Sequence, residues 1–569
     1  MPSVKDSVAS GYKMVHDASL DTLSTILGCK MAGSSADLQK TLAMATVTNP
    51  AILVARQQTI LHLRTRAPTI AEKWNKRFER LAEIEREVAP FFRNDSVNKD
   101  SLEDDAIAQL SFQHQFFKPL NHVPWLLFAV SIFKIWVVPA MSIMLPIIVW
   151  ILPYIILRFV HGLPITQDQY MHIIQQIMTG NLGVNAFDNI QPVVAEPLTL
   201  KGVVQYSMFA FTFIQGMVQP VQNALHLYKT DTVCTNIGRQ ILEVRKMIRE
   251  LRADVGHMNG IHVKLAFSLE GISETDERRA FIYIQDCPEN IHMVFRDIAH
   301  LEGMWRIATS KMLHPVIFSK GVFILNNCED ISLSVAASGK ETVKSSLKLT
   351  DQPHAILTGP NGGGKSSFLR AVLQSVLIGH AFGFAPAKEV FMPRFTWIAS
   401  GLQLRDTPGK LSMFETEVKF AAECLKAARR GGPGLVLYDE LFHSTNPPDS
   451  ARSAHQFLQR LWKQKEVFTL VSTHLFKLVA AAPSNVQAIC CAAEKGEDGE
   501  IKYSYGVQPG ICTVSSVHKV WERFGLVPGR KASASVAPAS EALVASASVA
   551  SSEASVASAS VASASEDSR

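Results

Sequence analysis

The chain has 569 residues, of which 47% are apolar and 19% are charged. At roughly 150 residues per domain this length predicts about four folding units, and the apolar content excludes a wholly disordered protein. The net charge of +5, from 56 basic and 51 acidic residues, excludes a strongly basic nucleic-acid binder but leaves room for a local basic groove.

The first 115 residues are predicted to be helical, because apolar residues such as Leu38, Leu42 and Ala45 recur at helical spacing. The stretch 69–90 is charged and amphipathic, which is typical of a solvated helix face. The N-terminus has no apolar run, so no secretory signal is expected. The eight cysteines include no CxxC pair, so we expect no zinc site and favour free thiols in a reducing compartment.

An apolar segment follows at 123–160, where Lys134 and Arg158 are the only charged residues. Between them, residues 135–157 give 23 positions without charge, more than the ~20 that cross a bilayer as a helix. Membrane insertion is therefore favoured over a buried core helix.

The topology of this segment has two readings, a single crossing or a tight hairpin that reverses near Pro139. As a hairpin, each arm would be ~28 Å long, barely enough for a ~30 Å hydrocarbon core. Residues 203–227 are also apolar, but Gln and Pro interrupt them. We interpret that stretch as a surface or core helix, with membrane contact as a weaker alternative.

Further along, 236–254 and 290–310 are predicted helices. From about residue 314 short β-rich runs begin, and strands and helices alternate to about 528, which predicts an α/β fold with a buried sheet. The last 39 residues contain 31 Ala, Ser and Val. They hold too little bulky apolar surface to pack a core, so a disordered tail is predicted.

The strongest motif is LTGPNGGGKSSF at 357–368, in which Gly359 precedes Gly364-Lys365-Ser366 at the spacing of a phosphate-binding loop. An apolar strand precedes it and a helix follows. Backbone N–H groups of such a loop surround phosphates, while Lys365 would reach the β- and γ-phosphates and Ser366 would bind Mg²⁺. The predicted ATP-binding residues are Gly359, Pro360, Asn361, Gly362, Gly363, Gly364, Lys365, Ser366 and Ser367.

Two later strands end in polar residues. GLVLYDEL at 434–441 ends in Asp439, predicted to hold Mg²⁺, and Glu440, predicted to orient or deprotonate the attacking water. FTLVSTHL at 468–475 ends in His474, at the place of a γ-phosphate sensor, although a lone histidine is more often structural. Lys365, Glu440 and His474 are thus the candidate catalytic residues.

These motifs together resemble the MutS family of DNA mismatch-repair ATPases, in order over about 220 residues. The segments that carry the resemblance are TGPNGGGKSS, GHAFGFAPAKEV (379–390), LSMFETEV (411–418), YDELFHSTNPPDS (438–450), STHLFKL (472–478) and VQPGICTVSSVHKVWERFGLVP (507–528). A weaker resemblance to the start of the family's helical lever covers 19–63.

The resemblance implies an α/β P-loop NTPase domain of the ABC/MutS type, C-terminal to an all-α lever domain with a hydrophobic helical insertion. It implies the cofactors ATP and Mg²⁺, bound DNA, and a homodimer or heterodimer in which Ser412 of one subunit contacts the nucleotide of the other. The expected divisions are a first lever half at 1–115, an insertion at 116–230 with a transmembrane hairpin at 123–160, a second lever half at 231–310, the ATPase domain at 311–530 and the tail at 531–569.

The chain also departs from the family pattern. It begins at the lever, without room for the mismatch-reading and connector domains, and the apolar insertion stands where the family has its DNA clamp. Gly362 replaces the usual methionine, and Phe442-His443-Ser444 replaces Gly-Arg-Gly. Mismatch recognition is therefore not implied, whereas no catalytic group is missing.

The motifs and the apolar segment are compatible with more than one function. We favour a membrane-associated MutS-like ATPase that binds DNA in mismatch repair or related DNA maintenance, its ATPase domain facing cytoplasm or nucleus. The alternative is a membrane-anchored mechanical or scaffolding ATPase without mismatch recognition, and an ABC transporter subunit is disfavoured because LSMFETE replaces the LSGGQ-type signature. The basic cluster Arg245–Arg252 is a DNA-binding candidate, or simply a solvated helix.

Overall fold

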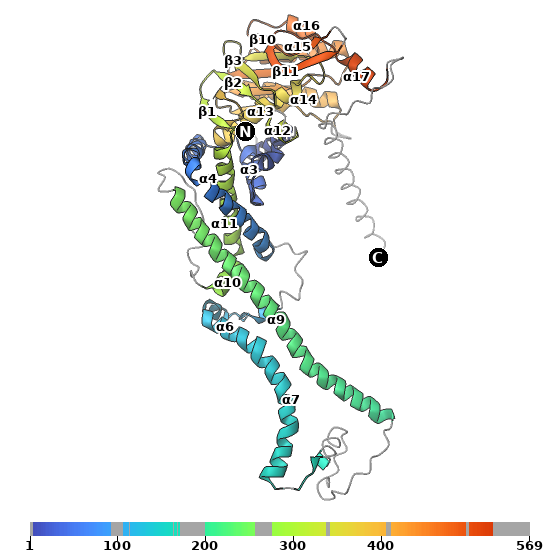
Figure 1. Ribbon diagram of the computed structural model, residues 1–569. Coiled ribbons are helices and arrows are strands. Elements are labelled where there is room, and N and C mark those ends of the chain that lie inside the picture. The colour runs from blue at the N-terminus through green and yellow to red at the C-terminus, as the bar shows by residue number, and fades with distance from the viewer. Residues whose placement is uncertain are drawn as a thin grey trace. The chain divides into compact units, whose positions relative to one another are not determined.

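The structure of the chain is a computed structural model (Figure 1) that divides into two compact units. Unit 1 holds residues 1–85, 250–265 and 294–569, and unit 2 holds 86–249 and 266–293. The predicted tail at 531–569 lies outside the described residues. The structure describes residues 4–92, 106–112, 114–162, 164–167, 169–170, 200–255, 276–336, 342–405, 411–496 and 500–526.

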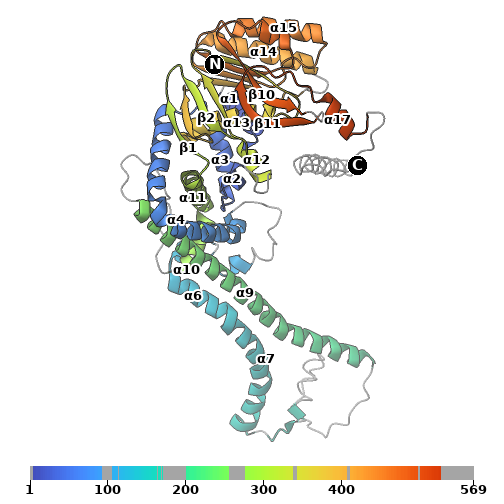
Figure 2. The same cartoon turned by 45° about the horizontal axis from the view of Figure 1, so that its top comes forward.

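A largely parallel sheet forms the centre of unit 1, with the strand order β11-β10-β4-β9-β8-β7 among the described residues (Figure 2). β7 to β10 and β4 run parallel, and only β11 pairs antiparallel at the edge. Every residue of β4, β8 and β9 is buried, as expected for strands covered by helices on both faces. The strands are β4 (His354–Thr358), β7 (Trp397–Gly401), β8 (Gly434–Tyr438), β9 (Val467–Ser472), β10 (Val486–Lys495) and β11 (Ile501–Pro509).

A second, smaller sheet has the order β3-β2-β6-β1-β5 among the described residues. Phe323 of this sheet packs its ring 6.0 Å from Phe468 of β9, and Phe395 lies against both rings, so one aromatic core joins the two sheets. Its strands are β1 (His314–Phe318), β2 (Phe323–Cys328), β3 (Ser345–Leu349), β5 (Phe384–Ala385) and β6 (Glu389–Met392). The helices around both sheets are α12 (Ile331–Ala336), α13 (Lys365–Phe382), α14 (Met413–Arg430), α15 (Pro447–Leu461), α16 (Phe476–Ala480) and α17 (Val517–Arg523).

The remainder of unit 1 is helical, and it joins segments from before and after the apolar insertion. The helices are α1 (Val4–Asp17), α2 (Leu23–Ile26), α3 (Gly33–Ala43), most of α4 (Pro50–Phe92), the end of α9 (Leu200–Val255) and most of α11 (Pro288–Thr309). The ring of Trp74 packs at a tilt against that of Trp305, with ring centroids 4.8 Å apart, and the Trp74 indole N–H donates to Asp254. The middle of α4 therefore packs against the C-terminal ends of α9 and α11 here.

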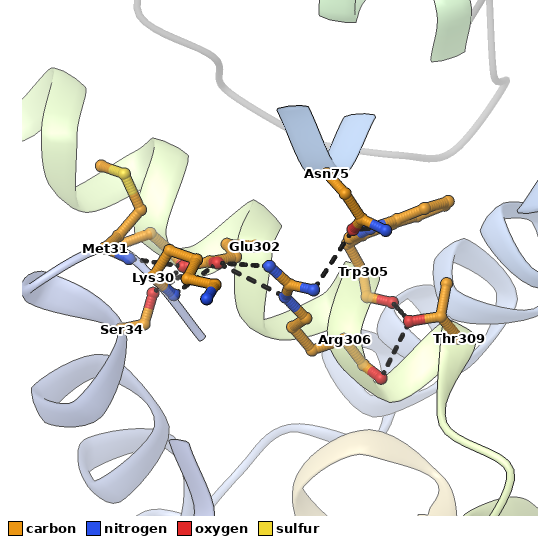
Figure 3. A network of polar contacts seen from close by, with 9 residues as sticks. Lys30, Met31, Ser34, Asn75, Glu302, Trp305, Arg306 and Thr309 are labelled. Carbon is orange, nitrogen blue, oxygen red and sulfur yellow. Dashed lines mark hydrogen bonds and ion pairs between the residues drawn. The ribbon is translucent and has the colours of Figure 1, made fainter. Parts of the chain in front are cut away.

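A buried carboxylate organises this helical part (Figure 3). Glu302 of α11 is fully buried and accepts hydrogen bonds from the backbone N–H groups of Lys30 and Met31, at 2.7 and 2.9 Å. The Ser34 hydroxyl donates to it at 2.8 Å, and the Arg306 guanidinium lies 3.3 Å away. The turn before α3 is thereby fixed to α11.

Side chains of the helical part also reach the helix that follows the phosphate loop. Gln374 of α13 donates to the carbonyl of Ala18, at 2.9 Å. At the other end of α13, Gln57 of α4 donates to the carbonyl of Gly383 at 2.9 Å, and Arg56 donates to that of Ala381 at 3.1 Å. A displacement of α13 would therefore act directly on α4.

Unit 2 contains the apolar helices. The backbone stays helical from Pro124 to Val160, through α6 (Pro124–Ile132), a π-helical turn at Phe133–Val137, α7 (Val138–Ile155) and a second π-helical turn at Ile156–Val160. The prediction of a reversal near Pro139 is thus wrong. A proline bends a helix, whereas a reversal requires turn residues, and 123–160 contains no Gly, Asn or Asp.

A polar cluster ties α6 to its neighbours in unit 2. Arg278 of α10 (Glu277–Asp286) pairs with Asp231 of α9 at 2.8 Å and donates to the Ser131 hydroxyl of α6 at 2.9 Å. Beside it, Ile135 and Leu227 belong to one small buried apolar cluster. The short helix Lys118–His122 precedes α6.

Two buried histidines make the stability of unit 1 depend on pH. Burial lowers the pKa of both His354 and His380 from 6.5 to about 4. His380 is held neutral because Nδ1 lies 2.9 Å from the Val376 carbonyl while Nε2 accepts the Phe395 N–H. The unfolded chain binds protons near pH 6.5 and the folded chain only near 4, so stability falls as pH drops through that window.

We therefore expect the melting temperature to decrease steadily from pH 7 to pH 4.5. Once the pH has fallen through the whole window, each histidine should have lowered the free energy of unfolding by about 3 kcal/mol. His380→Gln removes one titrating group and should flatten this slope, even if it lowers the melting temperature at pH 7. The exposed His518 provides the matched control, since His518→Gln should leave the slope unchanged. An unaltered slope in His380→Gln would refute the assignment.

Candidate active site

The phosphate loop occupies residues 359–364, between the buried strand β4 and helix α13. Gly359 has φ 148°, and a Cβ there would lie 3.0 Å from the carbonyl oxygen of Cys491. Gly364, with φ 96°, is the N-cap of α13. Only glycine suits these positions, and the loop directs the positive end of an 18-residue helix at its own centre, which favours anions.

Lys365 points its ammonium group into this loop. Nζ donates to the carbonyls of Gly359 and Pro360 at 3.0 and 3.1 Å, and it lies 3.3 Å from His474 Nε2. Burial lowers the pKa of Lys365, and the nearby Glu440 and Asp439 carboxylates oppose that shift. The loop thus holds a cation at its centre, where the sequence motif predicts phosphate oxygens.

Asp439 lies at the carboxyl end of β8, beside the start of α13. The Ser366 hydroxyl donates to one of its carboxylate oxygens and the Ser472 hydroxyl to the other. A hydroxyl and a carboxylate are hard oxygen ligands, and Mg²⁺ commonly takes one or two protein ligands together with phosphates. Ser366 and Asp439 therefore fit Mg²⁺, which would neutralise charge on the phosphates.

Glu440 follows in a left-handed conformation, with φ 53°. Its N–H donates to the Ser472 hydroxyl at 2.9 Å, and its carboxylate lies 3.3 Å from His474 Nε2. The His474 hydrogen bond lowers the pKa of Glu440, burial opposes this, and the charges of His474 and Lys365 add to the lowering. An ionised carboxylate thus stands beside the loop at neutral pH. Such backbone strain often occurs at functional sites.

Ser412 does not join this cluster within the chain. It is the N-cap of α14, where its hydroxyl accepts from the Glu415 N–H and donates to the Glu415 carboxylate in a capping box. The remaining predicted loop residues, Asn361, Gly362, Gly363 and Ser367, lie within or next to the phosphate loop.

Two residues of the site were not singled out from the sequence. Glu417 is fully buried and contacts Tyr438, His443 and Ser444, which follow or end β8. Glu417 therefore links α14 to the loop after Glu440. Its place in the segment LSMFETEV, which carries part of the family resemblance, could have identified it.

The other is Tyr505 in β11, which has φ 55° and stacks on Tyr503 with ring centroids 5.7 Å apart. A Cβ on Gly364 would lie 3.6 Å from its ring, so a half-exposed aromatic surface borders the phosphate loop. Such a surface can stack on a nucleotide base. The alternating sequence of the edge strand β11 did not indicate this role for Tyr505.

Comparisons with known proteins agree with this geometry. A family model described as MutS domain V matches residues 355–531. The DNA mismatch repair protein MutS of Thermus thermophilus is 33% identical over 172 residues, which are 30% of this chain and 21% of the relative. MutS of Leuconostoc mesenteroides is 30% identical over 224 residues, 38% and 26% of the two chains. DNA mismatch repair protein MutS 2 of Haloarcula marismortui is 30% identical over 206 residues, 36% and 22%.

A parallel sheet with a phosphate loop and an acidic strand end is the arrangement of a P-loop nucleotide-binding domain. More particularly, residues 355–531 match the family model of MutS domain V, so the resemblance seen in the motifs is confirmed for this region. The matched region spans only about a fifth to a quarter of the length of these relatives.

Proposed function

We propose that the chain is a membrane-associated MutS-like ATPase that hydrolyses ATP and couples this reaction to movement of its helices on DNA. The observation that supports it most is the convergence of Lys365, Ser366, Asp439, Glu440 and His474 around one loop. Lys365 would hold the phosphates, and Ser366 with Asp439 would hold Mg²⁺. Glu440, ionised beside His474, would orient the attacking water.

We further propose that two copies complete the site, as a homodimer or a heterodimer. Ser412 is exposed at the N-terminus of α14, an 18-residue helix whose positive end favours phosphate. A partner's nucleotide placed against this end would receive the Ser412 hydroxyl. The capping contact with Glu415 would then be exchanged for one with the nucleotide.

The reaction would reach the helical part through α13. Its N-terminus borders the phosphates, whereas its far end is hydrogen-bonded to Arg56 and Gln57 of α4. A shift of α13 on hydrolysis would therefore move α4, which is how an ATPase domain can work on a bound duplex. We place the ATPase domain in the cytoplasm or nucleus, at a membrane.

A steady-state ATPase assay of detergent-solubilised protein tests this function, with Lys365→Ala as the blank. The assay compares no DNA, homoduplex, single-mismatch duplex and branched duplex at two salt concentrations. Stimulation by one duplex that weakens with salt is the expected result, because phosphate contacts release counterions. Activity equal to the blank under every condition would overturn the proposal.

The alternative is a membrane-anchored mechanical ATPase that binds no DNA, and one observation favours it. In the basic cluster at 245–252, Glu250 pairs with Arg77 of α4, so acidic side chains interrupt the candidate DNA stripe. Turnover well above the blank but indifferent to every duplex would select this alternative.

A further inference from the structure

We propose that a lipid bilayer is crossed twice, outward by residues 135–157 and back by residues 202–228, so that both ends of the pair lie on one side. This inference rests on the membrane association proposed above and specifies the elements that make it. It differs from the hairpin within 123–160 that the sequence predicts.

The first arm is the helical stretch from Ile135 to Arg158. The helix Pro124–Leu145 has a mean hydropathy of 2.0 and only 22% of its apolar window is buried, so it is not a core helix. Between residues 140 and 160, no described side chain is buried. The 23 charge-free residues span about 34 Å, enough for a hydrocarbon core of about 30 Å.

The second arm is the N-terminal half of α9. Between Lys201 and Lys229 the chain has 27 residues without a charged Asp, Glu, Lys or Arg, and all of them are helical. Large apolar side chains are exposed along it, among them Met208, Phe211 and Ile214. Its length of about 40 Å exceeds the ~34 Å of the first arm. The second arm is also less apolar, since Pro124–Leu145 is the one helix among the described residues with the mean hydropathy of a membrane span. The arm contains glutamines, which in membranes pair with neighbouring helices.

The two arms start from the same cluster of contacts in unit 2, which we call the base. Ser131 of α6 and Asp231 of α9 share Arg278, and Ile135 shares an apolar cluster with Leu227. From this level the chain leaves along α7 and returns along α9, and both views show these helices extending from the same end of unit 2 (Figures 1 and 2). Each arm has a basic residue at both ends. Lys134 and Lys229 lie near the base, and Arg158 and Lys201 lie at the far ends.

A bilayer explains this pattern better than a protein partner. A helix that binds a protein groove carries one apolar stripe, whereas the consecutive residues Ile143, Met144 and Leu145, which point about 100° apart around the first arm, are all exposed. The Tyr154 ring and the Arg158 guanidinium, which lie in contact near the far end, form the aromatic and basic border typical of a membrane interface. If the first arm crosses, the chain must return before Asp231, because Asp231 packs beside Ser131 at the starting level, and we assign this return to α9.

Cysteine accessibility in the full chain tests the topology. The background carries Cys29→Ser and Cys287→Ser, since the other cysteines are buried. His161→Cys then probes the far end of the first arm, and Thr232→Cys, beside the base, is the matched control. Sealed vesicles with ATPase activity on their outer face are treated with a membrane-impermeant maleimide, before and after detergent.

We expect Thr232→Cys to react in intact vesicles and His161→Cys to react at least tenfold less until detergent is added. If both cysteines react equally and the protein stays in the membrane during a carbonate wash, the double crossing is overturned, whereas membrane association still holds. Release of the whole protein by carbonate would instead refute membrane association itself.

The second arm is tested separately, by measuring the fraction of the protein that stays in the membrane after a carbonate wash. Phe211→Lys with Ile214→Lys should reduce that fraction several-fold, because charges are costly within a bilayer. Val418→Lys, at an exposed apolar residue of α14, is the control and should have no effect. An unchanged fraction in the double variant would show that α9 does not cross.

Discussion

Glu440→Gln should reduce ATP turnover by at least ~100-fold while leaving ATP affinity within about twofold, the size expected for loss of a general base. The glutamine keeps the shape of the side chain but cannot accept a proton from water. Binding should persist, because Lys365 and the loop glycines remain in place. Phosphate release measures turnover, and fluorescent ATP titration measures affinity.

Glu423→Gln is a matched control, because Glu423 is an exposed carboxylate of α14 that lies outside the cluster. It should leave both quantities unchanged. If Glu440→Gln retains turnover within tenfold of the parent protein, another group positions the water.

Glu302→Leu should destabilise unit 1 by about 3–5 kcal/mol, one of the largest effects expected of any single substitution in the chain. The change leaves the N–H groups of Lys30 and Met31 without their acceptor and removes the ion-pair partner of Arg306, whose side chain is only 13% exposed (Figure 3). A lower denaturation midpoint and melting temperature, measured at pH 7, would report the loss.

The chain supplies a control of the same chemistry in Glu72 and Lys76, which form an exposed ion pair one helical turn apart, like Glu302 and Arg306. Glu72→Leu should leave the melting temperature unchanged, because solvent screens the pair. Equal losses from the two substitutions would show that the buried network contributes no more than a surface ion pair.

The candidate site was largely predictable, because its residues follow strands that appear in the sequence as continuous apolar runs. GLVLY and FTLVS each predict a buried strand, and parallel strands bring their ends to one edge of the sheet. Asp439, Glu440 and His474 therefore meet Lys365 as expected. The role of Ser412 toward a partner and the domain boundaries stay predictions.

Other features depend on long-range packing that no local pattern reports. Tyr505 reaches the loop only because β11 closes the edge of the sheet beside β10. Likewise, α9 is one continuous helix of 56 residues, and its two halves have different composition, so the sequence reads as separate segments. Pro139 suggested a turn, yet the helix continues through it, because its apolar neighbours include no Gly, Asn or Asp.

The contact between α4 and the end of α13 restricts how this chain can vary. Gly383 has φ 73°, and a Cβ there would lie 2.7 Å from the side chain of Gln57. The same glutamine donates to the Gly383 carbonyl, so a larger residue at either position displaces the other. A side chain at 383 should therefore require both a smaller residue at 57 and a left-handed backbone, so residue 383 should stay glycine wherever residue 57 is glutamine.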